Sequence, residues 1–161
     1  SGPLALSGMD AATANIARLL DAARKAKRPV IHIRHLGTVG GMFDPQGERG
    51  AFIKGLEPQG DELIIEKRMP NAFNDTGLQK ALENLGSLDV IVCGFMSHSS
   101  VSTTVRAAKD YGLRCTLVED ACATRDLPTA DGIISAEQVQ KAEMAIMNDN
   151  FATLTLTQNL I

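Results

Sequence analysis

The feature that most constrains the fold is the alternation of short β-branched runs with amphipathic helical segments along the chain. Strands are expected at residues 30–33, 62–66, 88–93, 115–118 and 151–156. Helical spacing of apolar residues separates them, at residues 10–23, 78–85, 100–111 and 136–147. Strands that alternate with helices form a parallel sheet through right-handed crossovers, with helices on both faces. The pattern therefore predicts a doubly wound α/β fold, in which ligands bind beyond the carboxyl ends of the strands.

The length and charge of the chain exclude several classes of protein. A chain of 161 residues suffices for one domain with a sizeable core. The net charge of -3, with scattered lysines and arginines, argues against a nucleic-acid surface. No apolar run approaches the roughly 20 residues of a membrane helix, and the start lacks the basic flank of a signal peptide. Three cysteines without paired spacing indicate a reducing compartment. We therefore expect a cytoplasmic protein whose partner is a small molecule.

Residues that typically begin or end helices define the limits of several predicted helices. Asp10 is the expected N-cap of the first helix, Pro29 closes that helix, and Gly86 stops the second. The glycine-rich stretch 36–60 has little periodicity, and loops of this length are more often functional than idle. We expect this stretch to form a mobile cover over a pocket. It is not a phosphate-binding loop, because no strand–glycine–helix order surrounds its glycines.

The loop after the third predicted strand carries the strongest signal for chemistry. Gly94 ends the strand, and a run of serines and threonines leads directly into a helix. Backbone N–H groups at the start of a helix form an anion or oxyanion site, and Ser100 lies in the first turn beside them. The alternative is that these hydroxyl groups only cap the helix. The local pattern leaves both interpretations open.

Two further loops carry charged residues at the same predicted edge of the sheet. Lys67 ends the second predicted strand, where a lysine can stabilise negative charge or move a proton. A solvated surface lysine is the alternative. The segment 119–126 could bind a ligand, or its charges could order the loop through pairing of Arg125 with a carboxylate. We favour the structural role for this segment.

Taken together, these segments resemble the isochorismatase-like cysteine hydrolase family. The resemblance lies in residues 94–110, in Lys67 with residues 71–73, and in residues 119–126, which occur in the family's order. It extends over residues 2–156. It implies a three-layer α/β/α sandwich around a six-stranded, parallel sheet. It also implies hydrolysis of small amides or carbamoyl compounds by an aspartate, a lysine and a cysteine.

The resemblance assigns roles to individual residues. Lys67 takes the position of the family's lysine and Ser100 that of its cysteine. The backbone amides of Ser100 and its neighbours, Ser99 among them, would form the oxyanion hole. The Phe95–Met96 bond would be the family's cis peptide, which aims those amides. For contact with substrate we expect His35, Phe73 and His98, although His98 could equally bind a loop carbonyl.

Serine in place of cysteine is the first departure from the family. A thiol, with a pKa of about 8.5, is easily activated, whereas a hydroxyl needs a positioned base. Cys93 lies within a strand and Cys122 does not match the family's position. Ser100 could be an engineered trap, a natural nucleophile activated by Lys67, or a bystander in a reaction that needs no nucleophile. We favour a crippled or altered site of the amidase type.

The second departure concerns the family's first strand, which carries the catalytic aspartate and lies in the middle of the sheet. It should precede Ser1 and is absent, and none of Asp10, Asp44 or Asp61 can replace its acid. Neighbouring strands would then expose long apolar edges. We therefore expect residues 1–161 to form one isochorismatase-like domain without its first strand. Either another polypeptide supplies that strand, or the natural chain begins earlier.

No metal or cofactor is expected. His32 and His35 are three residues apart on or near a strand, so they point to opposite faces and cannot easily share one ion. By resemblance we expect a homo-oligomer, either a dimer or a tetramer. The expected function is cleavage of a C–N bond in a small amide or carbamoyl compound, with reduced activity. The alternatives are a non-catalytic small-molecule-binding homologue and an ether hydrolase that releases pyruvate.

Overall fold

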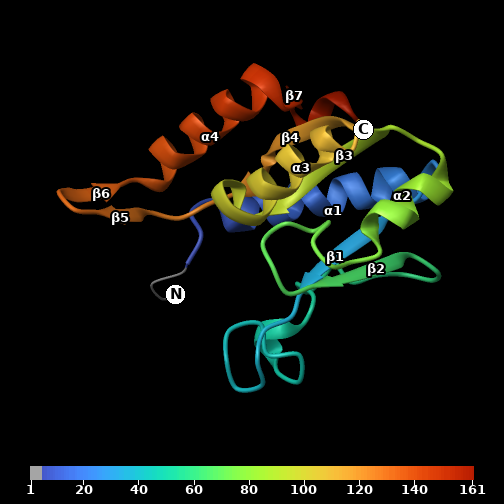
Figure 1. Cartoon of the computed structure of the whole chain (residues 1–161), viewed down its shortest axis with the longest axis horizontal. Helices are drawn as coiled ribbons and strands as arrows, with labels where there is room; N and C mark the ends of the chain where they lie inside the picture. Colours follow the sequence, from blue (N-terminus) through green and yellow to red (C-terminus); the bar gives the residue numbers. More distant parts are fainter. Residues whose placement is uncertain (1–4) are drawn as a thin grey trace.

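The computed structural model describes residues 5–161, in which helices and strands alternate as the sequence predicts (Figure 1). The elements are α1 (Met9–Lys25), β1 (Ile31–His35), β2 (Leu63–Lys67), α2 (Leu78–Leu85), β3 (Asp89–Phe95), α3 (Ser102–Asp110), β4 (Arg114–Ala123), β5 (Leu127–Thr129), β6 (Gly132–Ile134), α4 (Ala136–Asn150) and β7 (Ala152–Thr155). Three short turns complete them: η1 (Glu48–Gly50), the π-helical η2 (Ser97–Val101) and η3 (Thr157–Asn159).

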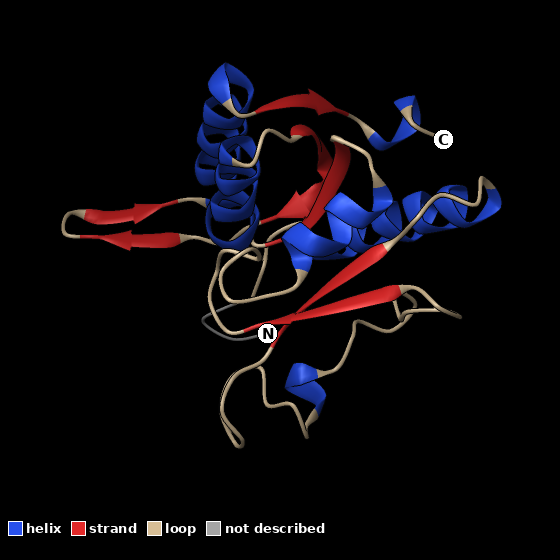
Figure 2. Cartoon of the chain, turned by 45° about the vertical axis from the view of Figure 1, so that its right-hand side comes forward, coloured by secondary structure: helices blue, strands red, loops and turns tan. Residues whose placement is uncertain are grey.

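The parallel strands form two half-sheets (Figure 2). In one, β1 pairs with β2, so that His35 lies opposite Lys67 at the carboxyl end. In the other, β4 lies between β3 and β7. Helix α1 packs against β4 and β3, while α3 packs on β4 and α4 on β7. This arrangement confirms the α/β fold with three layers, helices–sheet–helices.

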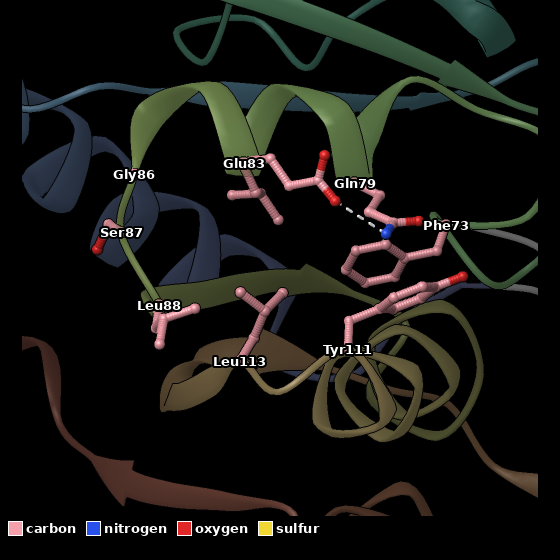
Figure 3. Close-up of a pocket in the computed structure, with 9 residues that line it drawn as sticks. Phe73, Gln79, Glu83, Gly86, Ser87, Leu88, Tyr111 and Leu113 are labelled. Atoms are coloured by element: carbon pink, nitrogen blue, oxygen red, sulfur yellow. Dashed lines mark hydrogen bonds between the residues drawn. The ribbon is translucent and has the colours of Figure 1, made fainter.

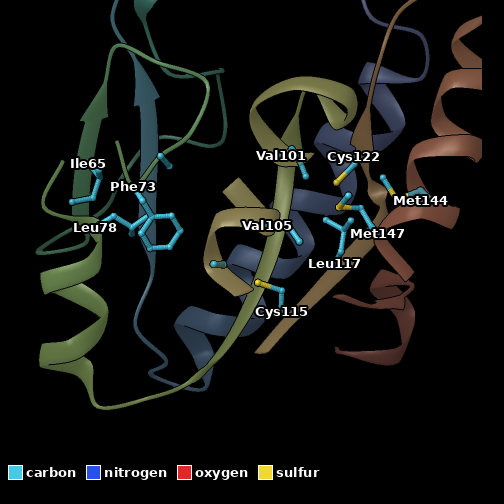
Figure 4. Packing of buried hydrophobic residues seen from close by; sticks show 12 residues of the cluster. Ile65, Phe73, Leu78, Val101, Val105, Cys115, Leu117, Cys122, Met144 and Met147 are labelled. Carbon is cyan, nitrogen blue, oxygen red and sulfur yellow. The ribbon is translucent and has the colours of Figure 1, made fainter. Parts of the chain in front are cut away.

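Strand β4 shows how the sequence separates the two faces. Leu117 and Val118 are adjacent and both fully buried, and side chains alternate between the faces of a strand. Leu117 belongs to a core with Val105 of α3 and Met147 of α4, shown in Figure 4. Val118 packs instead in a second core with Ile16 of α1. Both faces of β4 are therefore covered, as expected for a central parallel strand.

A groove separates the two half-sheets. It has a volume of about 800 Å³, and Ile31 and Ile33 of β1 line it together with residues 89–93 of β3. No described strand hydrogen-bonds to these two facing edges. Ile33 consequently remains 40% exposed and Ile91 53% exposed, although both lie in parallel strands. In a doubly wound sheet of order 3-2-1-4-5-6, this groove lies where the first strand belongs.

Three details differ from the expectations. Gly8, not Asp10, occupies the N-cap of α1, and Asp10 lies in the first turn, where a carboxylate favours the helix dipole. Strand β4 does not end at Val118 but continues to Ala123, because an irregularity in register lets it resume pairing with the end of β3. Turn η2 begins before Ser100, at Ser97, so the expected helical turn starts three residues early.

The antiparallel hairpin of β5 and β6 was not expected from the sequence, and it projects from the body of the molecule (Figure 1). Its strands are only three residues long, too short for a period-two pattern to stand out. The strand expected before Ser1 lies outside the described residues. No helix among residues 5–161 is long and apolar enough to cross a membrane.

Candidate active site

Lys67 is the centre of the site. It ends β2, and its side chain is only 5% exposed. Its Nζ donates to the carbonyl oxygens of Met69 and Pro70, both at 2.9 Å. It also lies 3.0 Å from Ser100 Oγ and 3.2 Å from His35 Nδ1. The structure thus brings together three residues that the sequence placed in three different loops.

Ser100 reaches Lys67 because of the turn that follows β3. The Phe95–Met96 peptide bond is cis, as the family resemblance implied. The chain then enters η2, where the carbonyl of Met96 accepts hydrogen bonds from the amides of Ser99 and Val101. The Ser99 amide is therefore already bonded within the turn, and it can serve a substrate oxygen only if it is shared.

Turn η2 is anchored by Ser97 and Gln140, two residues that no sequence motif had indicated. Ser97 is fully buried, and its hydroxyl donates to Gln140 Oε1 at 2.6 Å. Gln140 Nε2 in turn donates to the carbonyl of Glu119 at 3.3 Å. These bonds fix η2 to α4 and β4. No sequence motif links positions 97 and 140, so only the folded chain reveals this support.

Burial lowers the pKa of Lys67 to about 8. Removal of the ammonium from water disfavours the charged form. Among residues 5–161, no carboxylate lies within ion-pair distance of its Nζ to oppose this effect. At neutral pH a usable fraction of Lys67 is therefore a neutral amine, which can accept a proton.

His35 is fixed by the glycine-rich stretch. Its ring stacks on Phe43, with ring centroids 4.6 Å apart. Arg34, on the other face of β1, anchors the stretch by donating to the carbonyl of Gly50 at 2.7 Å. Burial, and then the charge of Lys67, lower the pKa of His35 and so favour its neutral form. The glycine-rich stretch, which was expected to cover the pocket, therefore contacts the site through Phe43.

The other two candidates for substrate contact have side-chain partners other than Lys67 and Ser100. His98 Nδ1 hydrogen-bonds the hydroxyl of Thr124 at 2.5 Å, and its partner is thus a side chain, not a loop carbonyl. Phe73 is buried in the core against Tyr111, with ring centroids 4.7 Å apart. It lines a cavity of about 230 Å³ beside α2 (Figure 3) and also the groove between the half-sheets. Contact of either residue with substrate stays a prediction.

The segment 119–126 is ordered differently from the expectation. Arg125 donates to the carbonyl of Asp126, and no ion pair of Arg125 occurs within the described part of the chain. Asp120 orders the segment instead, because its carboxylate accepts from both the amide and the hydroxyl of Thr157. The expected pairing of Arg125 was therefore wrong, whereas the carboxylates do have structural contacts.

No thiol is poised to replace Ser100. Burial raises the pKa of Cys93 to about 11 and that of Cys122 to about 12, so both thiols remain protonated.

The two neighbouring histidines do not form a metal site together. His32 bonds to Glu62 while His35 bonds to Lys67, which leaves the two histidines with different partners. Over residues 5–161, no three metal-binding side chains gather.

Comparison with known proteins identifies the family. The model of the Isochorismatase domain matches residues 1–159. The crystal structure of an isochorismatase from Pseudomonas putida KT2440 superposes with a TM-score of 0.98 at 70% identity, covering 100% of this chain and 83% of that chain. An uncharacterized isochorismatase family protein of Bacillus subtilis, YddQ, is 38% identical over 98% of this chain and 89% of its own length. Nicotinamidase 3 of Arabidopsis thaliana is 32% identical over 68% of this chain and 63% of its own.

The match of almost the whole chain agrees with the cis peptide after β3 and with the placement of Lys67 beside Ser100. This chain belongs to the isochorismatase family of hydrolases.

Proposed function

We propose that the chain is an amidohydrolase domain, which cleaves the C–N bond of a small amide or carbamoyl compound by acyl transfer to Ser100. The observation that carries the proposal is the distance of 3.0 Å between Lys67 Nζ and Ser100 Oγ. A hydroxyl becomes a useful nucleophile when a base of suitable pKa lies within hydrogen-bond reach. A relative named nicotinamidase supports an amide as the substrate class.

The proposed reaction begins with neutral Lys67. As Ser100 Oγ bonds to the carbonyl carbon, its O–H bond breaks and the proton passes to Lys67 Nζ. The developing oxyanion would meet the backbone amide of Ser100, which the family resemblance places in the oxyanion hole. The ammonium then returns its proton to the departing nitrogen as the C–N bond breaks. Attack by water on the acyl group releases the acid and restores Ser100.

We place the family's aspartate on an additional strand in the groove between β1 and β3. Three features support this location. The groove is lined by apolar side chains and flanked by two parallel edges. Lys67, at the carboxyl end of one half-sheet, has no carboxylate partner among the described residues. A carboxylate at the end of this strand would stabilise the ammonium that Lys67 becomes when it takes the proton of Ser100.

The strand is best joined to the N-terminal side of α1. Helix α1 leads into β1, and in a right-handed crossover a parallel strand of the same sheet precedes such a helix. The amide of Ser7 donates to the carbonyl of Thr124, just beyond the end of β4. The approach to α1 therefore starts at the carboxyl edge of the sheet. A strand that ends there would run parallel to β1 and β3.

The test uses the chain extended ahead of α1 by an apolar strand that ends in aspartate, matched in length to β1 and β3. Ammonia release is measured with a panel of small amides and carbamoyl compounds. Ser100→Cys should raise the rate, because a thiol is activated more easily. Lys67→Met should then lower it by about 10²- to 10⁴-fold.

Two controls sharpen this test. Ser99→Cys adds a thiol at the neighbouring position and should leave the rate at that of the parent. Replacement of the added aspartate by asparagine should reduce turnover as Lys67→Met does. Turnover at background for every compound, in a Ser100→Cys protein that remains folded, would refute acyl transfer.

The serine itself favours a second candidate, a binding protein that keeps the pocket without turnover. A hydroxyl lacks the ready ionisation of a thiol, so a bound amide could persist. Native mass spectrometry with a metabolite panel separates the two functions. A ligand that stays bound and chemically unchanged supports binding, whereas appearance of the corresponding acid supports hydrolysis.

A further inference from the structure

The turn that carries Ser100 is of an uncommon kind. In the π-helical η2, the amide of Val101 donates to the carbonyl of Met96, five residues back. The amide of Ser102 likewise donates to the carbonyl of Ser97. Such wide turns are rare, and they often occur at functional sites. Because Ser100 lies inside this turn, the direction of its side chain depends on the turn keeping its wide form.

Ser97, the first residue of η2, is fixed at two points. Its side chain has no access to water, so its hydroxyl group needs a hydrogen-bond partner inside the protein. Gln140 of α4 supplies the acceptor, Oε1, at 2.6 Å. The carbonyl of Ser97 accepts from Ser102, at the start of α3. The beginning of the turn is therefore tied to α4 by its side chain and to α3 by its backbone.

The carbonyl of Glu119 fixes the direction of the bond between Ser97 and Gln140. A carbonyl oxygen can only accept, so Gln140 turns its Nε2 to Glu119 and its Oε1 to Ser97. Glu119 lies between Leu117 and Cys122 of β4, where the register with β3 shifts, and it has no partner residue in β3 or β7. The irregularity in β4 thus leaves this carbonyl available to orient Gln140.

We propose that Gln140 is a positioning residue for the nucleophile, which holds the wide turn of η2 through Ser97 and so keeps Ser100 Oγ beside Lys67 Nζ. The proposal rests on the proposed function, because it concerns the same serine. Gln140 acts through Ser97, and not by contact with the reacting atoms. An α-helical turn bonds four residues back instead of five, so loss of the wide form would redirect the side chain of Ser100.

The other contacts of η2 hold the end of the turn. Thr103 Oγ1 donates to the carbonyl of Ser99 at 2.8 Å, and Val101 is buried in the core beneath α3. Both contacts lie beyond the residue that enters the turn. The bond from Ser97 to Gln140 holds its beginning, and the two ends together define how wide the turn is.

The test uses a thiol as a probe of position. Ser100→Cys is introduced into the chain of 161 residues, and the pKa of the new thiol is obtained from its rate of alkylation by iodoacetamide over a range of pH. The thiolate is the reactive form, and the ammonium of Lys67 should hold its pKa below about 8.5. Burial raises the pKa of Cys93 and of Cys115 to about 11 and that of Cys122 to about 12, so these thiols react slowly. Mass spectrometry of peptides confirms which residue is alkylated.

In this background, Gln140→Leu and Ser97→Ala should each raise the thiol pKa by about one unit. Neither substitution changes a charge, so the shift reports the distance between the thiol and Lys67. Gln79→Leu is the matched control, because it removes the same amide group from the exposed surface of α2. It should leave the pKa within a few tenths of the parent value. A thiol pKa that Gln140→Leu or Ser97→Ala leaves unchanged would overturn the proposal.

The double variant Ser97→Ala/Gln140→Leu separates positioning from stability. Each single variant leaves one member of the pair without its partner and should lower the midpoint of thermal unfolding. The double variant replaces both members with apolar groups and should recover most of that loss. Its thiol pKa should nevertheless stay raised by about one unit, because the turn still lacks its anchor. Recovery of the pKa together with the stability would show a merely structural role and overturn the proposal.

Turnover provides a second readout. In the extended Ser100→Cys chain described above, Gln140→Leu should lower kcat by about 10- to 100-fold and change KM by less than about threefold, because Gln140 does not contact the substrate. A raised KM with an unchanged kcat would contradict the proposal. The thiol measurements need no substrate. They therefore decide the role of Gln140 even if the panel of amides shows no turnover and the proposed function fails.

Discussion

The two half-sheets consist of similar apolar residues, yet they differ in how completely they are covered. In β4, Leu117 and Val118 are both inaccessible, because strands flank β4 on both sides and helices cover both faces. In β1 and β2, Ile33, Leu63 and Ile64 are each about 40% exposed. The same residue types therefore contribute unequally to stability. Lys67 stands on the thinly covered half, and Ser100 on the well covered one.

The site thus spans the boundary, here called the joint, between two half-sheets. The half-sheet of β3, β4 and β7 is well covered, whereas that of β1 and β2, the weak half, is thinly covered. Besides the contact of Lys67 with Ser100, the amide of Ala72 donates to Thr104 Oγ1 across the same joint, at 3.0 Å. Ala72 is almost inaccessible. The distance between base and nucleophile therefore depends on how firmly the β1–β2 half is held.

The largest expected effect comes from truncation of one residue in each half. Leu117→Ala should lower the free energy of unfolding by about 3 kcal/mol, because it leaves a cavity in a closed core. Ile33→Ala should cost less than about 1 kcal/mol, since its side chain already meets the groove. Chemical denaturation followed by circular dichroism measures both values.

This comparison also tests the additional strand. In a protein whose groove is filled, Ile33 becomes a core residue, and Ile33→Ala should then cost about 2 kcal/mol. Leu117→Ala should be unaffected by the filling. Equal costs for the two variants in the chain of 161 residues would contradict the difference in cover between the halves.

An intermediate effect is expected at the joint. Thr104→Val keeps the shape of the side chain but leaves the buried amide of Ala72 without its acceptor, which should cost about 2 kcal/mol. It should also slow the proposed reaction by loosening Lys67 relative to Ser100. Thr103→Val is the matched control, because Thr103 bonds to the carbonyl of Ser99 within one half. A larger effect of Thr103→Val on turnover would argue against the joint as the sensitive element.

The sequence predicted the five parallel strands and the helices because each has a strong local signal. Residues 88–93 are an almost unbroken apolar run, and Gly86 provides the stop that α2 requires, with a φ of 68°. The sequence did not predict the hairpin of β5 and β6, because its two short strands show no clear alternation of apolar and polar residues. The first turn of α1 was displaced because Gly8, in a left-handed conformation, begins the helix without a side-chain cap.

The sequence predicted which residues lie at the ends of strands, but not the contacts that they make in the site. The sequence placed Lys67 and Ser100 at the ends of strands, and parallel topology brings such ends to one edge. It could not reveal that Met69 O, Pro70 O and His35 Nδ1 surround the same Nζ. Those contacts depend on backbone carbonyl directions and on strand register, and no residue type encodes either one.

The smallest predicted effect concerns how the weak half is attached to α1. Glu62, just before β2, accepts from Arg24 Nε of α1 at 2.7 Å and contacts His32 Nε2 at the same distance. The hydrogen bond from Arg24 is the main cause that holds the pKa of Glu62 well below its usual 4.5, helped by the amide of Gln59 and by His32. An ion pair, and not the burial of apolar side chains, therefore attaches α1 to the half-sheet of β1 and β2.

A depressed carboxyl pKa stabilises the fold only while the group is ionised. The contribution of Glu62 is therefore complete above about pH 4.5 and declines as the pH falls below this value. Glu62→Gln should cost roughly 1 kcal/mol at pH 7, and its deficit relative to the parent should shrink in acid. Thermal unfolding between pH 7 and pH 3 measures the difference. A deficit that grows on acidification would mean that the β1–β2 half is held to α1 by something other than this carboxylate.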